Sequence, residues 1–231
     1  MGNKSSIFSR IRSNKNDNTA NTDDHVVDTL NNKGRQQLHE IAPDLVPHYD
    51  AINTIIYSED DFYIPSRATK LDDCLYLGSI EDAKNITKLK EHGVTYIINT
   101  AESPYEVDEA QRKCLYDETF RYMGFDAEDA MDYPIMKHFE EVHAFIEEAR
   151  KNNSKCLLHC MRGVNRSGVL ATAHVMVRNN IGPISATQIV YKKRGMLLTN
   201  SSFVSQLLIY AKDNGYLELD KDHVILNKNE K

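Results

Sequence analysis

Short apolar runs separated by longer mixed stretches make up most of the chain after residue 65. The apolar runs carry β-branched and aromatic residues, which favour strands, and they predict strands at 74–77, 95–98, 120–124 and 156–159. Apolar residues recur at helical spacing through 135–151, and further helices are predicted at 80–92, 166–179, 184–194 and 201–213. Strands that alternate with helices predict an α/β fold: a central, mostly parallel twisted sheet flanked by helices.

Individual residues mark where some of these elements begin and end. Ser79 can cap the first predicted helix, and Gly93 can end it in a left-handed conformation. The strand at 156–159 is apolar throughout, so we expect it to be buried on both faces. The run Lys192-Lys193-Arg194 is typical of an exposed helix end.

Composition changes along the chain and suggests four parts. Residues 1–24 are polar and basic, and we expect a disordered arm, because they hold too few apolar residues to offset the entropy of ordering. Residues 25–65 form a partly ordered extension, in which the isoleucines at 52, 55 and 56 suggest a short amphipathic stretch. The compact domain is predicted at 66–217, and a charged tail at 218–231.

The overall charge and hydropathy exclude several classes of protein. The 231 residues carry a net charge of −6, which gives no electrostatic footprint for nucleic acid. No apolar run reaches the roughly 18 residues of a membrane span, and the first residues lack the apolar core of a secretory signal. We therefore expect a cytoplasmic location.

The chain has four cysteines, which are too few and too scattered for a disulfide framework: Cys74, Cys114, Cys156 and Cys160. Spacings typical of metal ligands, such as Cys-x-x-Cys or His-x-x-x-His, are also absent from the sequence. Cys156 lies in an apolar strand, which indicates a core position. The remaining question is whether one of these thiols is reactive.

The stretch Leu157-Leu158-His159-Cys160-Met161-Arg162-Gly163-Val164-Asn165-Arg166-Ser167-Gly168 carries the chemistry. A buried strand ends, a loop turns and a helix starts at Arg166, and such a loop binds anions with its amides and with the positive end of the helix. The same field favours the thiolate of Cys160, the form that attacks phosphorus. Arg166 can clamp two phosphate oxygens with its planar fork, and Ser167 can donate a hydrogen bond to the sulfur.

The loop itself is predicted to bind phosphate through the six residues Met161, Arg162, Gly163, Val164, Asn165 and Arg166. Gly163 lets the backbone approach the ligand closely. We expect His159 to fix the loop from behind. Arg162 has two open interpretations: a solvated surface charge, or a group that favours acidic or multiply phosphorylated substrates.

His-Cys-x5-Arg-Ser at 159–167 resembles the signature of the cysteine-dependent protein tyrosine phosphatase superfamily, and the length and helix pattern resemble its small (atypical) dual-specificity branch. The resemblance extends over about 66–215. Leu75-Tyr76-Leu77-Gly78 is similar to the family's first strand, and Asn99-Thr100-Ala101-Glu102 to its Asn-x-Ala-Glu turn. It implies a phosphotyrosine protein phosphatase-like fold and two-step hydrolysis of phosphotyrosine and phosphoserine or phosphothreonine through a phosphocysteine.

Asn200-Ser201-Ser202-Phe203, with Gln206-Leu207, is similar to the family's Asn-x-Gly-Phe-x-x-Gln-Leu segment. Two departures occur here. Ser202 stands where the family usually has Gly, and Gly195 stands where it often has Pro. They bear on the local backbone conformation and leave the chemistry of the loop intact.

The resemblance also implies a general acid, an aspartate about thirty residues before the cysteine, because an alkoxide or phenoxide leaves poorly without a proton. The acidic loop offers four candidates: Asp126, Glu128, Asp129 and Asp132. The family's pattern falls on Asp129, and Asp126 is the second choice. No metal or other cofactor is expected, since the arginine, the amides and the helix end supply the positive charge.

Two rival functions remain open. A phosphoinositide phosphatase would use the same loop, although relatives with that role carry further basic residues in it. A non-catalytic module that binds phosphorylated groups is disfavoured because Cys160, Arg166 and Ser167 are all present. The expected partners are phosphorylated protein substrates.

The amino terminus, Met1-Gly2-Asn3-Lys4-Ser5-Ser6, matches the pattern for myristoylation at Gly2. One myristoyl chain binds membranes only marginally, so a second signal is required. Four basic residues that precede the first acidic one can supply it by attraction to an anionic leaflet: Lys4, Arg10, Arg12 and Lys15. We expect reversible association with cytoplasmic membrane faces. The rival interpretation is a mitochondrial presequence, because this stretch is basic and free of acids.

Overall fold

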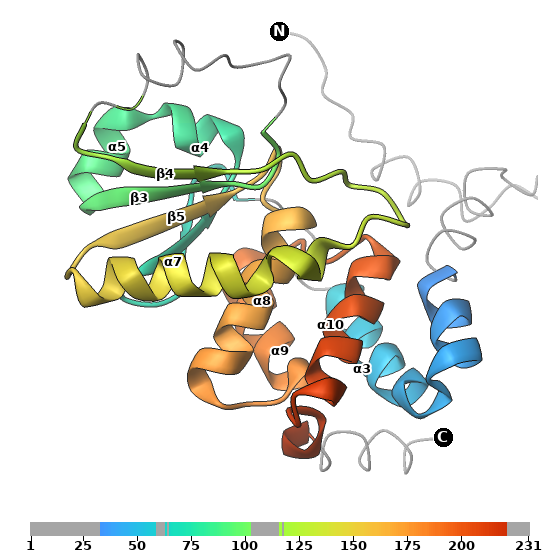
Figure 1. The fold of residues 1–231 in the computed structure, drawn as a ribbon. Coiled ribbons are helices and arrows are strands. Elements are labelled where there is room, and N and C mark those ends of the chain that lie inside the picture. Colours follow the sequence, from blue (N-terminus) through green and yellow to red (C-terminus); the bar gives the residue numbers. More distant parts are fainter. Residues whose placement is uncertain (1–32, 59–62, 64, 103–115, 117, 221–231) are drawn as a thin grey trace, which may run out of the picture.

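The computed structural model describes residues 33–58, 63, 65–102, 116 and 118–220 (Figure 1). A five-stranded sheet runs through it in the order β1-β2-β5-β3-β4, with β1 antiparallel and the other pairs parallel. The strands are β1 (Thr69–Lys70), β2 (Leu75–Gly78), β3 (Val94–Asn99), β4 (Arg121–Gly124) and β5 (Lys155–His159). The predicted fold class is confirmed, and each predicted strand lies within two residues of its expected bounds.

Helices cover both faces of this sheet, with α4 and α5 on one side and α7 and α8 on the other (Figure 1). The described helices of the domain are α4 (Ile80–Lys84), α5 (Ile86–His92), η2 (Ile135–His138), α7 (Phe139–Lys151), α8 (Arg166–Asn179), α9 (Pro183–Arg194), α10 (Ser201–Asp213) and η3 (Leu217–Asp220). The helix expected at 135–151 therefore starts with a 3-10 turn, η2, before α7.

The two faces follow from the alternation of side chains along each strand. In β2, Leu75 and Leu77 belong to the large core under α7 and α8, whereas Tyr76 points to the smaller core under α4 and α5. In β5, Leu158 faces the large core and Leu157 the small one. Helices cover both faces of the sheet, so β2 and β5 are buried on both sides. Their sequences are therefore continuous apolar runs.

The single helix predicted at 80–92 is two helices, α4 and α5, separated at Asn85. Ser79 caps α4, as the sequence predicts, and the structure adds a capping box with Asp82. Asn85 then adopts a non-helical conformation and accepts a hydrogen bond from the Lys88 N–H at 3.1 Å, so it caps α5 in turn. Gly93 ends α5 in the left-handed conformation with φ 73°, as expected.

The predicted extension at 25–65 is helical over much of its described part. Residues 33–41 are helical, and η1 (Pro43–Leu45) and α3 (Val46–Ile56) follow. These segments pack beside α9 and α10, at the side of the domain away from α4 and α5 (Figure 1). The predicted arm, 1–24, lies outside the described residues.

The predicted tail, 218–231, is partly inside the fold. Asp220 is fully buried, and its carboxylate accepts hydrogen bonds from the N–H of Ile184 at 2.5 Å and the hydroxyl of Ser185 at 2.8 Å. It therefore caps the amino end of α9, where a negative charge is favourable. η3 therefore packs against α9, and the domain boundary at 217 stays a prediction; 221–231 lie outside the described residues.

None of the described helices is both long and apolar enough to span a bilayer.

Candidate active site

The predicted phosphate loop lies at the carboxyl end of the central strand. β5 is flanked by β2 and β3, and Cys160 follows its last residue, His159. The His159 carbonyl accepts hydrogen bonds from the N–H of Thr100 at 2.9 Å and from its hydroxyl at 3.1 Å. The chain leaves β5 for α8 on one face of the sheet and leaves its neighbour β2 for α4 on the other face, and ligands of open α/β sheets bind at such points.

Cys160 lies at the start of the loop with its sulfur surrounded by donors. The Gly163 N–H and the Ser167 hydroxyl each donate to Sγ at 3.2 Å. Burial alone raises the pKa of this thiol, but the hydrogen bonds from Ser167 and the charge of Arg166 outweigh that effect, so the pKa lies below its ordinary value. These surroundings favour the thiolate, as the sequence predicts. The side chain is 2% exposed, yet it reaches a pocket.

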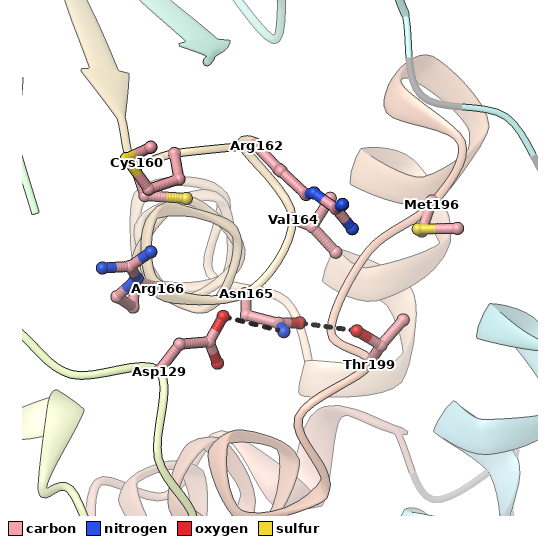
Figure 2. A pocket seen from close by; sticks show the side chains of 9 residues that line it. Asp129, Cys160, Arg162, Val164, Asn165, Arg166, Met196 and Thr199 are labelled. Atoms are coloured by element: carbon pink, nitrogen blue, oxygen red, sulfur yellow. Dashed lines mark hydrogen bonds between the residues drawn. The ribbon is translucent and has the colours of Figure 1, made fainter. Parts of the chain in front are cut away.

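The pocket has a volume of about 320 Å³ and opens above the loop (Figure 2). Cys160, Arg166 and Asp129 stand on one side of it, and Arg162 and Met196 on the other (Figure 2). The residues that line it are Asp129, Cys160, Met161, Arg162, Val164, Asn165, Arg166, Met196 and Thr199. Five of the six residues predicted to bind phosphate are among them, and Gly163 is the sixth.

Gly163 has a further reason to be glycine, besides the close approach to a ligand that the sequence suggested. Its φ is 69°, and a Cβ at this position would clash with the carbonyl oxygen of Gly78 and the guanidinium of Arg194. The close approach therefore involves the protein's own interior behind the loop. Its N–H is aimed forward, at the Cys160 sulfur.

Arg194 corrects the expectation of an exposed helix end at 192–194. Lys192 and Lys193 are exposed, but Arg194 is 0% exposed and holds the loop from behind. Its guanidinium donates to the carbonyl oxygens of Gly163 and Arg162 at 3.2 and 3.1 Å, and to the carbonyl of Arg67 at 3.2 Å. Nothing in the local sequence distinguishes Arg194 from its two basic neighbours.

Arg166 begins α8 and joins the loop to the acidic segment. One Nη donates to the carbonyl oxygen of Ala127 at 3.1 Å. Its Nε is buried and has no hydrogen-bond partner among the described residues, so this donor is available to an oxygen of a ligand. The guanidinium lies next to Cys160 in the pocket (Figure 2).

Of the four acidic candidates, Asp129 is the one that lines the pocket. Its two carboxylate oxygens accept hydrogen bonds from the side-chain amides of Asn165 at 3.1 Å and Asn200 at 3.0 Å. Asp126 instead forms an isolated bridge with Ala101 and does not line the pocket. The sequence contained Asn200 in a family-like segment but gave no reason to place it beside Asp129.

His159 is buried behind the loop, and its pKa is lowered to about 4 by burial. Its ring is therefore neutral near pH 7. Neither ring nitrogen has a hydrogen-bond partner among the described residues, so the ring supports the loop by packing, and the backbone carbonyl provides the polar attachment.

Cys160 differs from the other described cysteines in the direction in which the pKa of its thiol is shifted. Within the described ranges Cys74, Cys156 and Cys160 are free, and burial raises the pKa of both Cys74 and Cys156. Cys114 lies outside the described residues. No group of three or more His, Cys, Asp or Glu in the described part of the chain is arranged to hold a metal ion.

Comparison with known proteins identifies the fold and its relatives. The family model "Dual specificity phosphatase, catalytic domain" matches residues 75–213. The MAP kinase phosphatase with leucine-rich repeats protein 2 of Dictyostelium discoideum is 36% identical over 141 residues, which are 61% of this chain and 19% of that protein. Human dual specificity protein phosphatase 15 is 35% identical over 133 residues, 58% of this chain and 42% of the relative.

Solved structures give the same result. The crystal structure of DUSP15 superposes with a TM-score of 0.57 at 29% identity and covers 67% of this chain and 94% of that one. Human DUSP28, at 24% identity and a TM-score of 0.58, shares the fold over 66% of this chain and 97% of its own. The chain spans less than half the length of the first curated relatives it matches.

Proposed function

We propose that this chain, which belongs to the dual specificity phosphatase family, hydrolyses phosphotyrosine and phosphoserine or phosphothreonine on proteins through a phosphocysteine. The single observation that carries the proposal is the sulfur of Cys160. It accepts two hydrogen bonds at the base of a pocket that also contains a guanidinium and a carboxylate. A nucleophile, an anion clamp and an acid within one cavity are the groups that such a reaction requires.

The first step transfers the phosphoryl group to the enzyme. The Cys160 thiolate attacks phosphorus, an S–P bond forms, and the bond from phosphorus to the substrate oxygen breaks. Asp129 gives its proton to that oxygen, so that an alcohol or phenol leaves. Arg166 and the loop amides stabilise the equatorial phosphate oxygens in the transition state.

The second step restores the enzyme. Asp129, now a carboxylate, takes a proton from a water molecule, whose oxygen attacks the phosphocysteine. The S–P bond breaks, inorganic phosphate forms, and the sulfur leaves as a thiolate. The Ser167 hydroxyl, 3.2 Å from that sulfur, stabilises the leaving thiolate.

Substitution Cys160→Ser tests the mechanism directly. We expect it to abolish turnover of a phosphotyrosine peptide and of a small aryl phosphate, while binding of the peptide persists. Rapid acid quench of the wild-type protein with ³²P-labelled peptide should trap label on the protein, and none in the variant. A Cys160→Ser protein with wild-type turnover would refute the mechanism.

A phosphoinositide phosphatase is the second candidate, and Arg162 is the observation that favours it. Its side chain lines the pocket opposite Arg166, where it can contact a second anionic group (Figure 2). Phosphopeptides and short-chain phosphoinositides assayed side by side separate the two functions. Faster turnover of the phosphoinositides, lost in Arg162→Ala, would favour the second candidate.

We further propose that the amino terminus attaches the protein to cytoplasmic membrane faces through myristoylated Gly2 and the basic residues of the arm. The support is the sequence motif alone, since 1–32 lie outside the described residues. Labelling with a myristate analogue should require Gly2, and Gly2→Ala should abolish both the label and binding to anionic vesicles. Absence of label from the wild-type protein would exclude the proposal.

A further inference from the structure

The helical extension contacts α10 through very small residues. The Gly34 N–H donates to the Ser201 hydroxyl at 3.3 Å, and the Ser205 hydroxyl donates to the Gly34 carbonyl at 3.0 Å. A Cβ at position 34 would clash with the backbone carbonyl of Ser201. The two helices therefore approach as closely as their backbones allow, and this approach requires glycine.

The extension is also firmly seated on the domain. Leu38, Tyr49 and Ile52 are each 0% exposed within the main core. Burial raises the pKa of the Tyr49 phenol, and hydrogen bonds to Asn53 and Ser201 oppose that rise. Tyr49 from α3 and Gly34 thus reach the same serine. The extension fixes the first turn of α10 at two points.

That first turn holds the acidic loop. Asn200, the N-cap of α10, donates from its amide to Asp129 at 3.0 Å and to the Ala130 carbonyl at 3.4 Å. Ser201 donates to the sulfur of Met131 at 3.7 Å. Three successive loop residues therefore contact two successive residues of α10. The position of Asp129 depends on the position of this turn.

We propose that the helical extension, residues 33–56, positions Asp129 for proton transfer, acting through Ser201 and Asn200. The proposal rests on the function of Asp129 proposed above. The extension precedes residues 75–213, the stretch that the family model matches. Asn200, Ser201 and Gly34 are positioning residues, since none of them lines the pocket.

The first test separates the amide of Asn200 from its role as a helix cap. Asn200→Ser keeps a side-chain oxygen that can accept from the Ser202 N–H but removes the donor to Asp129. We expect kcat/KM for a phosphotyrosine peptide to fall about tenfold, the loss of one hydrogen bond to a charged group. Turnover of an aryl phosphate with an acidic phenol should fall less than twofold, because that leaving group needs little protonation.

The second test moves the extension itself. Gly34→Ala forces residues 33–41 away from Ser201, and we expect the same pattern: a loss of about threefold to tenfold on the phosphotyrosine peptide and a loss below twofold on the activated aryl phosphate. Gln37→Ala is the matched control, because Gln37 is exposed on the same helix and should leave both rates unchanged. A general loss of folding would lower the turnover of both substrates by the same factor, and that result would overturn the proposal.

A double-mutant cycle with Asp129→Asn distinguishes this proposal from the one on which it rests. In the Asp129→Asn background neither Asn200→Ser nor Gly34→Ala should lower kcat/KM further, since the group they position is already lost. If Asp129→Asn alone has no effect, the proposed general acid is wrong. If Asp129→Asn is severe but the losses from Asn200→Ser and Gly34→Ala simply add to it, the extension does not act through Asp129.

Discussion

The guanidinium of Arg194 donates to the carbonyl oxygen of Gly163 at 3.2 Å, although the two residues are 31 positions apart in the sequence. The same side chain donates to the Arg162 carbonyl at 3.1 Å and to the Thr69 hydroxyl at 3.1 Å. When these carbonyls are bound from behind, the Gly163 N–H is held toward the Cys160 sulfur. A residue outside the pocket thus fixes the shape of the loop inside it.

Arg194→Lys should therefore damage the loop more than its conservative nature suggests. An ammonium cannot reproduce the planar fork that binds several acceptors at once, so buried carbonyls lose their donors. We expect the free energy of unfolding to fall by about 2–4 kcal/mol and turnover to fall with it. Urea unfolding and a phosphatase assay measure both. Lys192→Ala, on the exposed side of the same helix, should behave like wild type, and an unaffected Arg194→Lys would contradict this role.

Asp129→Asn should cut kcat on a phosphotyrosine peptide by about 10²–10⁴, because the leaving oxygen loses its proton donor. Binding of the peptide should persist, since the clamp and the loop are unchanged. Asp126→Asn is the control, as that residue does not line the pocket. Should Asp126→Asn be the inactive variant and Asp129→Asn the active one, the assignment of the acid must be reversed.

Ser167→Ala should raise the pKa of the Cys160 thiol, because the hydroxyl is one of the donors that stabilise the thiolate against burial. The pH profile of alkylation by iodoacetamide should move to higher pH, and breakdown of the phosphocysteine should slow. Cys160→Ser identifies the fast-alkylating residue, since the other described cysteines are buried with raised pKa values. An unchanged alkylation profile would show that the hydroxyl does not act on the sulfur.

His174 should make the protein sensitive to acid. Its ring is fully buried on α8 next to His143, and burial lowers its pKa to about 3. As the pH falls, the ring of His174 therefore binds a proton in the unfolded state before it does so in the folded state. The stability that neutral His174 contributes is fully present above about pH 6.5 and is lost as the pH falls toward 3. From this residue alone the free energy of unfolding should be roughly 2 kcal/mol lower at pH 5 than at pH 8.

Urea unfolding of His174→Leu at the two pH values tests this prediction. The variant should lose much less stability between pH 8 and pH 5 than the wild type. Exposed His39→Gln is the control for the loss of one imidazole. Equal losses in His174→Leu and the wild type would show that another group carries the acid sensitivity.

Local patterns in the sequence were sufficient to predict most strands and helices of the domain and the reactive residues of the phosphate loop. Strands β2 and β5 could be predicted because residues buried on both faces form continuous apolar runs. Cys160, Arg166 and Ser167 could be placed together because one short turn joins them. The N-cap at Ser79 and the helix end at Gly93 could be predicted for the same reason: each depends on neighbours within a few residues.

The ends of helices and the breaks between them were harder to predict from the sequence. The interruption at Asn85 divides a stretch that the sequence presents as one helix, since a cap and a helical position can carry the same residue. Gly195, which departs from the family pattern, has φ 78°, a conformation that proline cannot adopt. The departure therefore accompanies a different backbone at this point, which composition alone does not reveal.

Only the tertiary structure decided which polar residues act together. Asp129 meets Asn200 across 71 positions, and Gly34 meets Ser201 across 167. The sequence offered four carboxylates, among which only the family resemblance favoured Asp129, and it placed Arg194 on the surface with its lysine neighbours. Residue type and spacing report on contacts within one element or turn. Hydrogen bonds between separate elements depend on how those elements pack, and packing is set by the whole core at once.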